Sequence, residues 1–164
     1  MEVSKKAASY MKLATNSFKF KLFLLRDLPM GFIAGLRVRE LNPEKCVVTI
    51  PYKYLTKNPF KSIYFACLAM AGEMSTGALG VVAIFGQKPS VSMLVQGIEG
   101  EFSKKAVGLI TFTCNEGRKM LEAVERSKAS GEGETATCLS IGVDEEGNEV
   151  ARFKLTWSFK ARSK

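Results

Sequence analysis

Residues 58–77 read NPFKSIYFACLAMAGEMSTG and contain a single carboxylate within a run of apolar and small residues. From Ile63 to Leu79 no polar face is wide enough to meet water, and a helix that is apolar all round is a buried helix. Glu73 is the one charged side chain in that run. An unpaired buried carboxylate costs several kcal/mol or stays protonated. The pattern therefore predicts a functional carboxylate on a buried helix.

Length and composition limit the possible fold of the chain and its expected location in the cell. Its 164 residues are 46% hydrophobic, which is enough material for one domain with a substantial core. No stretch of eighteen or more apolar residues is free of charge, so we expect no membrane span. The apolar part of the N-terminus is broken by charges and does not resemble a signal peptide. The four cysteines stand singly, which predicts reduced core residues of a cytoplasmic protein.

The chain contains no histidine. This absence excludes a Ser-His or Cys-His nucleophile, a histidine metal triad and an imidazole acid or base. Because the cysteines form no CxxC pair either, we expect no metal site. The available chemistry is that of carboxylates, amides, hydroxyls and backbone dipoles.

The net charge of +8 leaves two interpretations open. A basic chain can bind nucleic acid, an anionic membrane or a phosphorylated small molecule, or it can carry a solvated basic surface. The lysines and arginines are spread along the chain, and no stacking aromatics interleave with the basic pairs. We therefore expect no specific nucleic-acid partner, and phosphate binding stays open beside the solvated surface.

The hydrophobic periodicity gives the order of elements. Helices are predicted over residues 2–28, about 60–79 and 115–128. Strands are predicted over residues 32–41, 46–50, 91–102, 106–114, 135–143 and 149–160. An antiparallel sheet that curls around one fully apolar helix explains why that helix has no polar side. We expect an α+β fold with an N-terminal helical extension over 1–28 and a single domain over 29–164.

This order of elements, with Asn58 before the long helix and Glu73 within it, resembles the hot-dog fold thioesterases. The likeness is greatest to the phenylacetate-pathway type and its uncharacterised relatives. Their pattern is roughly Asn-x-x-Gly-x-x-His-Gly-Gly, three residues, then Thr-Leu-Ala-Asp-x-Ala-x-Gly. Asn58, Glu73 and Gly77 match the asparagine, the acid and the final glycine. The resemblance implies the hot-dog fold, in which a curled antiparallel sheet wraps around a long central helix.

The chain departs from the family pattern ahead of the acid. Lys61 stands in place of the first glycine, and Tyr64-Phe65-Ala66 stands in place of His-Gly-Gly. In the family, that histidine and the glycine after it line the thioester site, and the backbone N–H of this glycine polarises the carbonyl. By resemblance the amide of Phe65 takes this role, with Tyr64 beside the substrate.

The resemblance implies an acyl-CoA thioesterase without a cofactor. Glu73 acts as general base or nucleophile, since burial moves a carboxyl pKa toward neutrality, and Asn58 positions the water. For Glu73 the alternative is a carboxylate satisfied by a nearby hydroxyl of Ser75 or Thr76. Asn58 is equally an ordinary residue of a turn before a helix.

Further residues are expected to contact the substrate, an acyl-CoA or acyl-carrier thioester. Ser92 is the candidate for the additional hydroxyl that the family places on the next strand. Lys104 and Lys105 are candidates for binding the coenzyme A phosphates. The family builds its sites between two protomers, so we expect a homodimer or a tetramer of dimers, paired through strand 91–102. A non-catalytic acyl- or lipid-binding hot-dog protein is the alternative function.

Overall fold

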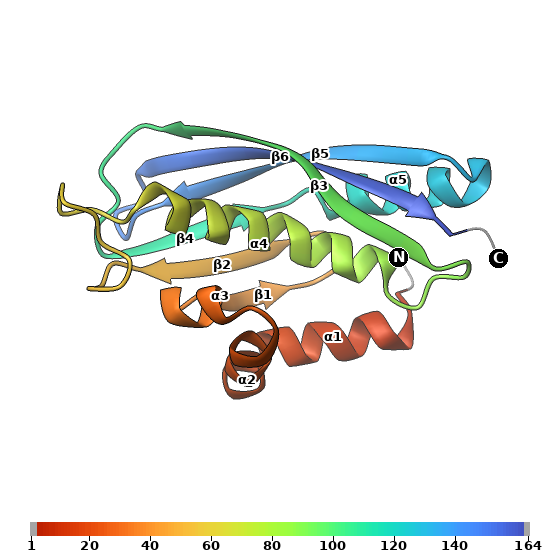
Figure 1. The fold of residues 1–164 in the computed structure, drawn as a ribbon, viewed down its shortest axis with the longest axis horizontal. Coiled ribbons are helices and arrows are strands. Elements are labelled where there is room, and N and C mark those ends of the chain that lie inside the picture. The colour runs from red at the N-terminus through yellow and green to blue at the C-terminus, as the bar shows by residue number, and fades with distance from the viewer. Residues whose placement is uncertain (1–2, 163–164) are drawn as a thin grey trace.

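Six strands form one antiparallel sheet in the order β1-β2-β4-β5-β6-β3 (Figure 1). A computed structural model describes residues 3–162. The strands are β1 (Arg37–Leu41), β2 (Cys46–Pro51), β3 (Val91–Phe102), β4 (Leu109–Cys114), β5 (Gly133–Val143) and β6 (Glu149–Ala161). The predicted sheet is confirmed, and β1 and β3 are its two edges.

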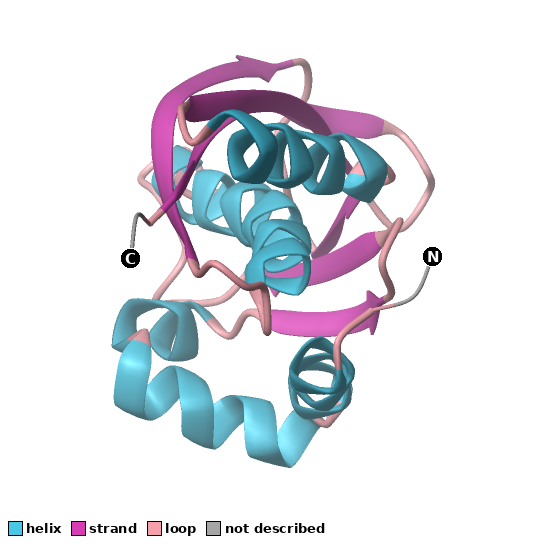
Figure 2. Ribbon diagram, turned by 90° about the vertical axis from the view of Figure 1, so that its right-hand side faces the viewer, coloured by secondary structure: helices cyan, strands magenta, loops and turns pink. Residues whose placement is uncertain are grey.

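The long helix α4 (Phe65–Ile84) lies inside the curl of this sheet. It contacts all six strands, and α5 (Gly117–Ser130) packs beside it on the same side of the sheet. Figure 2 shows the strands curving around these two helices. By length and composition α4 could also cross a membrane, but 67% of its most apolar window is buried inside the fold. The predicted α+β architecture around a buried helix is thus confirmed.

Glycines allow α4 to approach the sheet at van der Waals distance. A Cβ placed on Gly72 would lie 2.6 Å from the ring of Phe153, and one on Gly80 would collide with the Met93 methyl. The sequence predicts an end of the helix near Gly80, but the helix continues past it to Ile84. These glycines therefore set the depth at which α4 sits instead of ending it.

Two buried hydrogen bonds fix the rotation of α4 against the sheet. The hydroxyls of Ser75 and Ser140 lie 2.7 Å apart, and Trp157 Nε1 donates to Thr76 Oγ1 over 3.0 Å. Because a buried polar atom without a partner is costly, these pairs tie one face of α4 to β5 and β6.

The single N-terminal helix predicted over 2–28 is wrong, and its first residue lies outside the described residues. The structure has α1 (Lys5–Thr15) and α2 (Ser17–Asp27), which meet at Asn16. The Asn16 side chain accepts a hydrogen bond from the Lys19 amide over 3.0 Å and so begins a new helix. Asparagine is a strong N-cap and competes with helix continuation.

Two further predicted boundaries are wrong for similar local reasons, and a third is shifted. Residues 32–34, predicted as strand, belong to α3 (Pro29–Ala34), which begins at a proline and ends at Gly35 with φ of 80°. The long helix begins at Phe65 instead of residue 60, because Asn58 organises the preceding residues into a turn. The strand predicted from residue 106 begins at Leu109, after Gly108 with φ of 75°.

Replacing Gly72 by alanine is expected to destabilise the fold, because the new methyl group meets the buried Phe153 ring. Overpacking of this kind costs about 1–3 kcal/mol of unfolding free energy. Urea or thermal unfolding measures the loss. Gly133→Ala is the matched control, since its added methyl group would meet nothing within 4 Å. Equal stability of the two variants would contradict the close approach.

Candidate active site

Glu73 projects from the middle of α4 into a cavity of about 530 Å³. The cavity is bounded by α4, by the first residues of β3 and by the N-terminal helices. Trp157 of β6 and Ser92 of β3 line it with Glu73, and Arg162 also borders it. The carboxylate is partly buried and faces a space large enough for a small ligand.

The carboxylate of Glu73 makes no hydrogen bond with a protein group among residues 3–162. Neither suggested hydroxyl partner serves it. Ser75 Oγ bonds to the carbonyl of Gly72 and to Ser140, and Thr76 Oγ1 donates to the backbone carbonyl of Glu73 and accepts from Trp157. Burial raises the pKa of Glu73 above its ordinary value. A carboxyl without a protein partner and with a raised pKa suits proton transfer.

Gly77, one turn after Glu73, leaves room for the carboxylate. A Cβ at this position would lie 3.1 Å from Glu73 Oε1 and 3.1 Å from the Trp157 indole. A side chain would therefore displace one of the two. This contact gives a physical reason for a glycine at a position that matches the family pattern.

Tyr10 of α1 is a residue that the sequence did not single out for the site. It lines the same cavity as Glu73 and packs edge-on against Phe85, with ring centroids 5.3 Å apart. Burial raises the pKa of Tyr10, and the neighbouring Cys46 and Glu73 raise it further. The phenol therefore stays protonated near the carboxylate. In the sequence Tyr10 was one of several apolar-periodic residues, and only packing of α1 against α4 brings it here.

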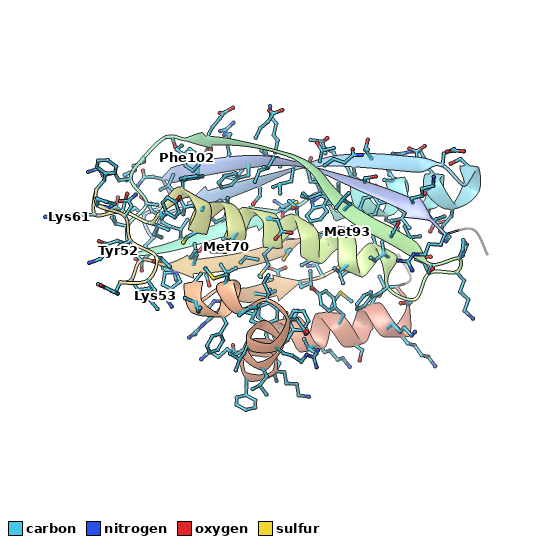
Figure 3. The ribbon with its side chains drawn as sticks, in the orientation of Figure 1. Tyr52, Lys53, Lys61, Met70, Met93 and Phe102 are labelled. Carbon is cyan, nitrogen blue, oxygen red and sulfur yellow. The ribbon has the colours of Figure 1, made fainter. Side chains whose placement is uncertain are left out.

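Asn58 lies in the loop before α4 and holds that loop in shape. Its Oδ1 accepts from the Phe60 amide over 2.9 Å and from the amide and hydroxyl of Ser62. Lys61, at the tip of the loop in Figure 3, has φ of 58°. The oxygen of Asn58 is thus occupied by the turn, and the Nδ2 donates to no protein group among the described residues.

The N-terminus of α4 presents free backbone donors. The amides of Phe65 and Ala66 have no protein acceptor in the described part of the chain, and Tyr64 provides no side-chain cap. Unpaired amides at a helix N-terminus favour negative charge. This end of the helix borders a second cavity of about 560 Å³, which Asn58, Tyr64 and Phe65 line.

Lys104 and Lys105 border this second cavity, but they differ in how far other protein groups already neutralise their charges. Lys104 Nζ lies 2.9 Å from Asp144 Oδ2, and this contact holds the pKa of Asp144 at about 2. Among residues 3–162, Lys105 Nζ donates only to the backbone carbonyl of Phe60, over 3.4 Å. Lys105 therefore keeps its charge for a ligand, whereas Lys104 shares its charge with Asp144.

Within one chain the predicted site residues fall into two groups. Glu73 and Ser92 line the first cavity, while Asn58, Tyr64, Phe65 and both lysines line the second. Eight residues of helix separate Phe65 from Glu73, or about 12 Å at 1.5 Å per residue. Figure 3 shows Met93 and Phe102, which mark the two ends of β3 near these groups. A single protomer therefore does not combine the carboxylate with the helix N-terminus.

Three cysteines that stand apart in the sequence meet in the sheet. Cys46 pairs with Cys114 across β2 and β4, and ligand atoms of Cys114, Glu116 and Cys138 lie within 4.8 Å of one another. This group could hold a metal by its donor types, although no metal site was predicted. The Glu116 carboxylate already accepts from Lys119 and from the Leu139 amide, and the thiols are fully buried. A hydrogen bond to Cys114, together with burial, raises the pKa of the Cys138 thiol.

Sequence comparison places the chain in a family. Residues 17–159 match the family described as "Domain of unknown function (DUF4442)". The chain belongs to the DUF4442 family. The sequence matches none of the curated proteins. The family match begins at α2 and ends in β6, so it includes Glu73 and the lining of the second cavity, whereas Tyr10 and Arg162 of the first cavity lie outside it.

Solved structures that are similar to this DUF4442 protein confirm the predicted hot-dog fold. A Pseudomonas aeruginosa protein of unknown function, described as a probable thioesterase, superposes with a TM-score of 0.74 at 18% identity, covering 99% of this chain and 100% of that one. A thioesterase from Haemophilus influenzae gives 0.63 at 12% identity, covering 89% and 91%. A variant of another Pseudomonas aeruginosa thioesterase gives 0.68 at 10% identity, covering 90% and 95%.

Replacing Glu73 by glutamine is expected to stabilise the fold above the pKa of Glu73. The folded pKa is raised, so the carboxyl favours the folded state below its unfolded pKa, and this contribution is lost as pH rises through the folded pKa. The uncharged amide avoids that loss. Thermal unfolding from pH 4 to 8 should show a gain for Glu73→Gln that grows with pH. Glu122→Gln, at an exposed residue of α5, is the control. A gain that is independent of pH would contradict the assignment.

Proposed function

We propose that this protein is an acyl-CoA thioesterase whose site forms between two protomers. Glu73 of one protomer activates water, and the α4 N-terminus of the other binds the thioester carbonyl. The observation that carries this proposal is the unpaired carboxylate of Glu73, which has a raised pKa and lines a cavity at the β3 edge of the sheet.

The open edge of the sheet supports pairing between two copies. Helices α1 and α2 lie against β1, but no element within residues 3–162 pairs with the outer side of β3. The edge exposes Leu94, Val95, Ile98 and Phe102, with exposed fractions of 41–67%. A long, apolar, unpaired edge invites a second strand.

The position of these apolar residues suggests the register of the pair. They span residues 94–102, and the middle of that span is Ile98. A two-fold axis at Ile98 sets Leu94 of one strand opposite Phe102 of the partner subunit, because the strands run antiparallel. Val95 pairs with Trp157, whose indole lies beside Glu73. Phe102 contacts Phe65 edge-on, with ring centroids 6.3 Å apart. This register brings the α4 N-terminus of the partner toward Glu73.

The chemistry then follows from the two groups. The Glu73 carboxylate removes a proton from water as the water oxygen attacks the thioester carbonyl carbon. The amides of Phe65 and Ala66 stabilise the negative charge that develops on the carbonyl oxygen. The carbon–sulfur bond breaks, and the thiolate takes the proton back from Glu73. Lys105, on the protomer that supplies the α4 N-terminus, would bind a coenzyme A phosphate. Lys104 contributes less, because Asp144 neutralises its charge.

A non-catalytic acyl-binding protein is the second candidate. The Phe65 side chain is 56% exposed and packs edge-on against Tyr64, with ring centroids 4.8 Å apart, where the thioesterase pattern has glycine and histidine. These rings narrow the approach to the amides at the start of α4. In this second function both cavities still bind an acyl ligand, but no thioester is hydrolysed.

The dimer predicts a mass in solution of about 36 kDa by light scattering, twice the 18.0 kDa of one chain. Ile98→Asp sets two like charges opposite each other at the proposed axis and removes apolar contact, so it should give monomers. Val107→Asp adds the same charge to an exposed loop residue and should leave the dimer intact. A parent protein of about 18 kDa at micromolar concentration would reject the dimer.

Glu73→Gln is expected to abolish most hydrolysis of acyl-CoA substrates, because the amide cannot accept a proton. A positioned base contributes roughly a hundredfold or more. A panel of acyl-CoA thioesters with detection of the free thiol measures the turnover. Asn58→Ala should lose less, since Asn58 shapes the loop and transfers no proton. Glu122→Gln serves again as the control, and turnover by Glu73→Gln equal to that of the parent would exclude the mechanism.

A further inference from the structure

We propose that the groove beneath the N-terminal helices holds the acyl chain of the substrate, and that Val81 limits the chain length. The inference rests on the proposed function for the site at Glu73. It assigns a substrate class, unbranched aliphatic acyl groups of medium to long chain, and gives α1 and α2 a role in recognising it.

A third cavity, of about 810 Å³, adjoins the Glu73 cavity. The two cavities share five lining residues, namely Tyr10, Phe23, Val81, Ile84 and Val91. In the proposal, the two cavities join along these shared residues into one groove that runs from Glu73 toward the C-terminal end of α4. The Glu73 carboxylate then lies at one end of a mainly apolar groove.

The walls of the groove suit a hydrocarbon chain. The groove is lined by α4, by the start of β3, and by α1 and α2, which lie below α4 in Figure 1. Leu13 joins the shared residues in lining the interior. The charged groups Lys6 and Arg26 border the end far from Glu73. A flexible apolar ligand fits such a lining better than a polar or charged one.

The length of the groove indicates the size of the chain. Eleven residues of α4 separate Glu73 from Ile84, or about 16 Å at 1.5 Å per residue. An extended chain advances about 1.2 Å per bond, since a residue of three backbone bonds spans about 3.5 Å. The groove thus holds about twelve to fourteen carbons beyond a carbonyl placed at Glu73.

Val81 is the residue best placed to set this length. Val81 is partly buried and lies two helical turns beyond Glu73. It borders both the Glu73 cavity and the cavity of about 810 Å³. A larger side chain here would divide the groove without touching the carboxylate. In the proposed dimer the partner strand reaches Leu94, so the part of β3 that borders this groove at Val91 stays outside the pair.

Displacement of a fluorescent anthroyloxy fatty acid by straight-chain fatty acids of four to sixteen carbons tests the groove without hydrolysis. Each buried methylene raises affinity by up to roughly fourfold, so binding should tighten with length and level off at about twelve to fourteen carbons. Val81→Phe should stop this rise at about eight to ten carbons. Its affinity for dodecanoate should fall about tenfold or more. Val107→Phe, at an exposed loop residue, should bind as the parent does.

Two results would overturn the proposal. One is a parent protein that binds dodecanoate no more tightly than hexanoate, and the other is a Val81→Phe protein with the length profile of the parent. Glu73→Gln separates this proposal from the proposed function, because it should keep the binding profile while losing turnover. Length-dependent binding by a parent that hydrolyses no acyl-CoA would support the groove and reject the thioesterase.

Discussion

The absence of a polar face on α4 is the constraint on which the rest of the structure depends. A twenty-residue helix of this composition must be covered on every side, and a single sheet can cover only the sides around which it curls. The sheet approaches closely where Gly72 and Gly80 leave room for Phe153 and Met93. On the side that the strands leave open, α1 and α2 complete the cover, and the space that they fail to fill is the groove leading from Glu73.

The same constraint accounts for the unusual state of Glu73. The hydroxyls nearest to it in sequence, those of Ser75 and Thr76, are used to hold α4 against β5 and β6. They cannot also serve the carboxylate, so burial raises its pKa without compensation from a donor in the described part of the chain. A residue that only stabilised the fold would be replaced by an uncharged one at a gain in free energy of unfolding. The loss of folding stability caused by the Glu73 carboxylate is the physical argument for its role in catalysis. At this position a gain in stability is expected to lower activity.

The sequence was sufficient for the fold because the long-range pattern of apolar residues is strong. The run around Glu73 predicted a buried helix, and the hydrophobic periodicity predicted a strand over 149–160. Boundaries failed where one side chain or backbone angle decides them, as at Asn16 and Gly35. The grouping of Cys46, Cys114 and Cys138 was missed because it arises from strand order, which local patterns do not encode. Tyr10 was missed for a related reason, since its approach to Glu73 depends on how α1 packs on α4.

The separation of the predicted site residues into two cavities follows from the geometry of one helix. Asn58 and Glu73 match a single sequence motif in which Phe65 takes a glycine position, yet the helix holds Glu73 about 12 Å from its own N-terminus. A motif of this spacing can act as one site only if a second helix supplies the missing half. The open edge of β3, whose apolar residues are centred on Ile98, provides the means for a second copy to do so. One arrangement therefore encloses α4, leaves β3 exposed and divides the motif between two cavities. In it the fold is complete in a single chain, whereas the proposed site is complete only in two chains.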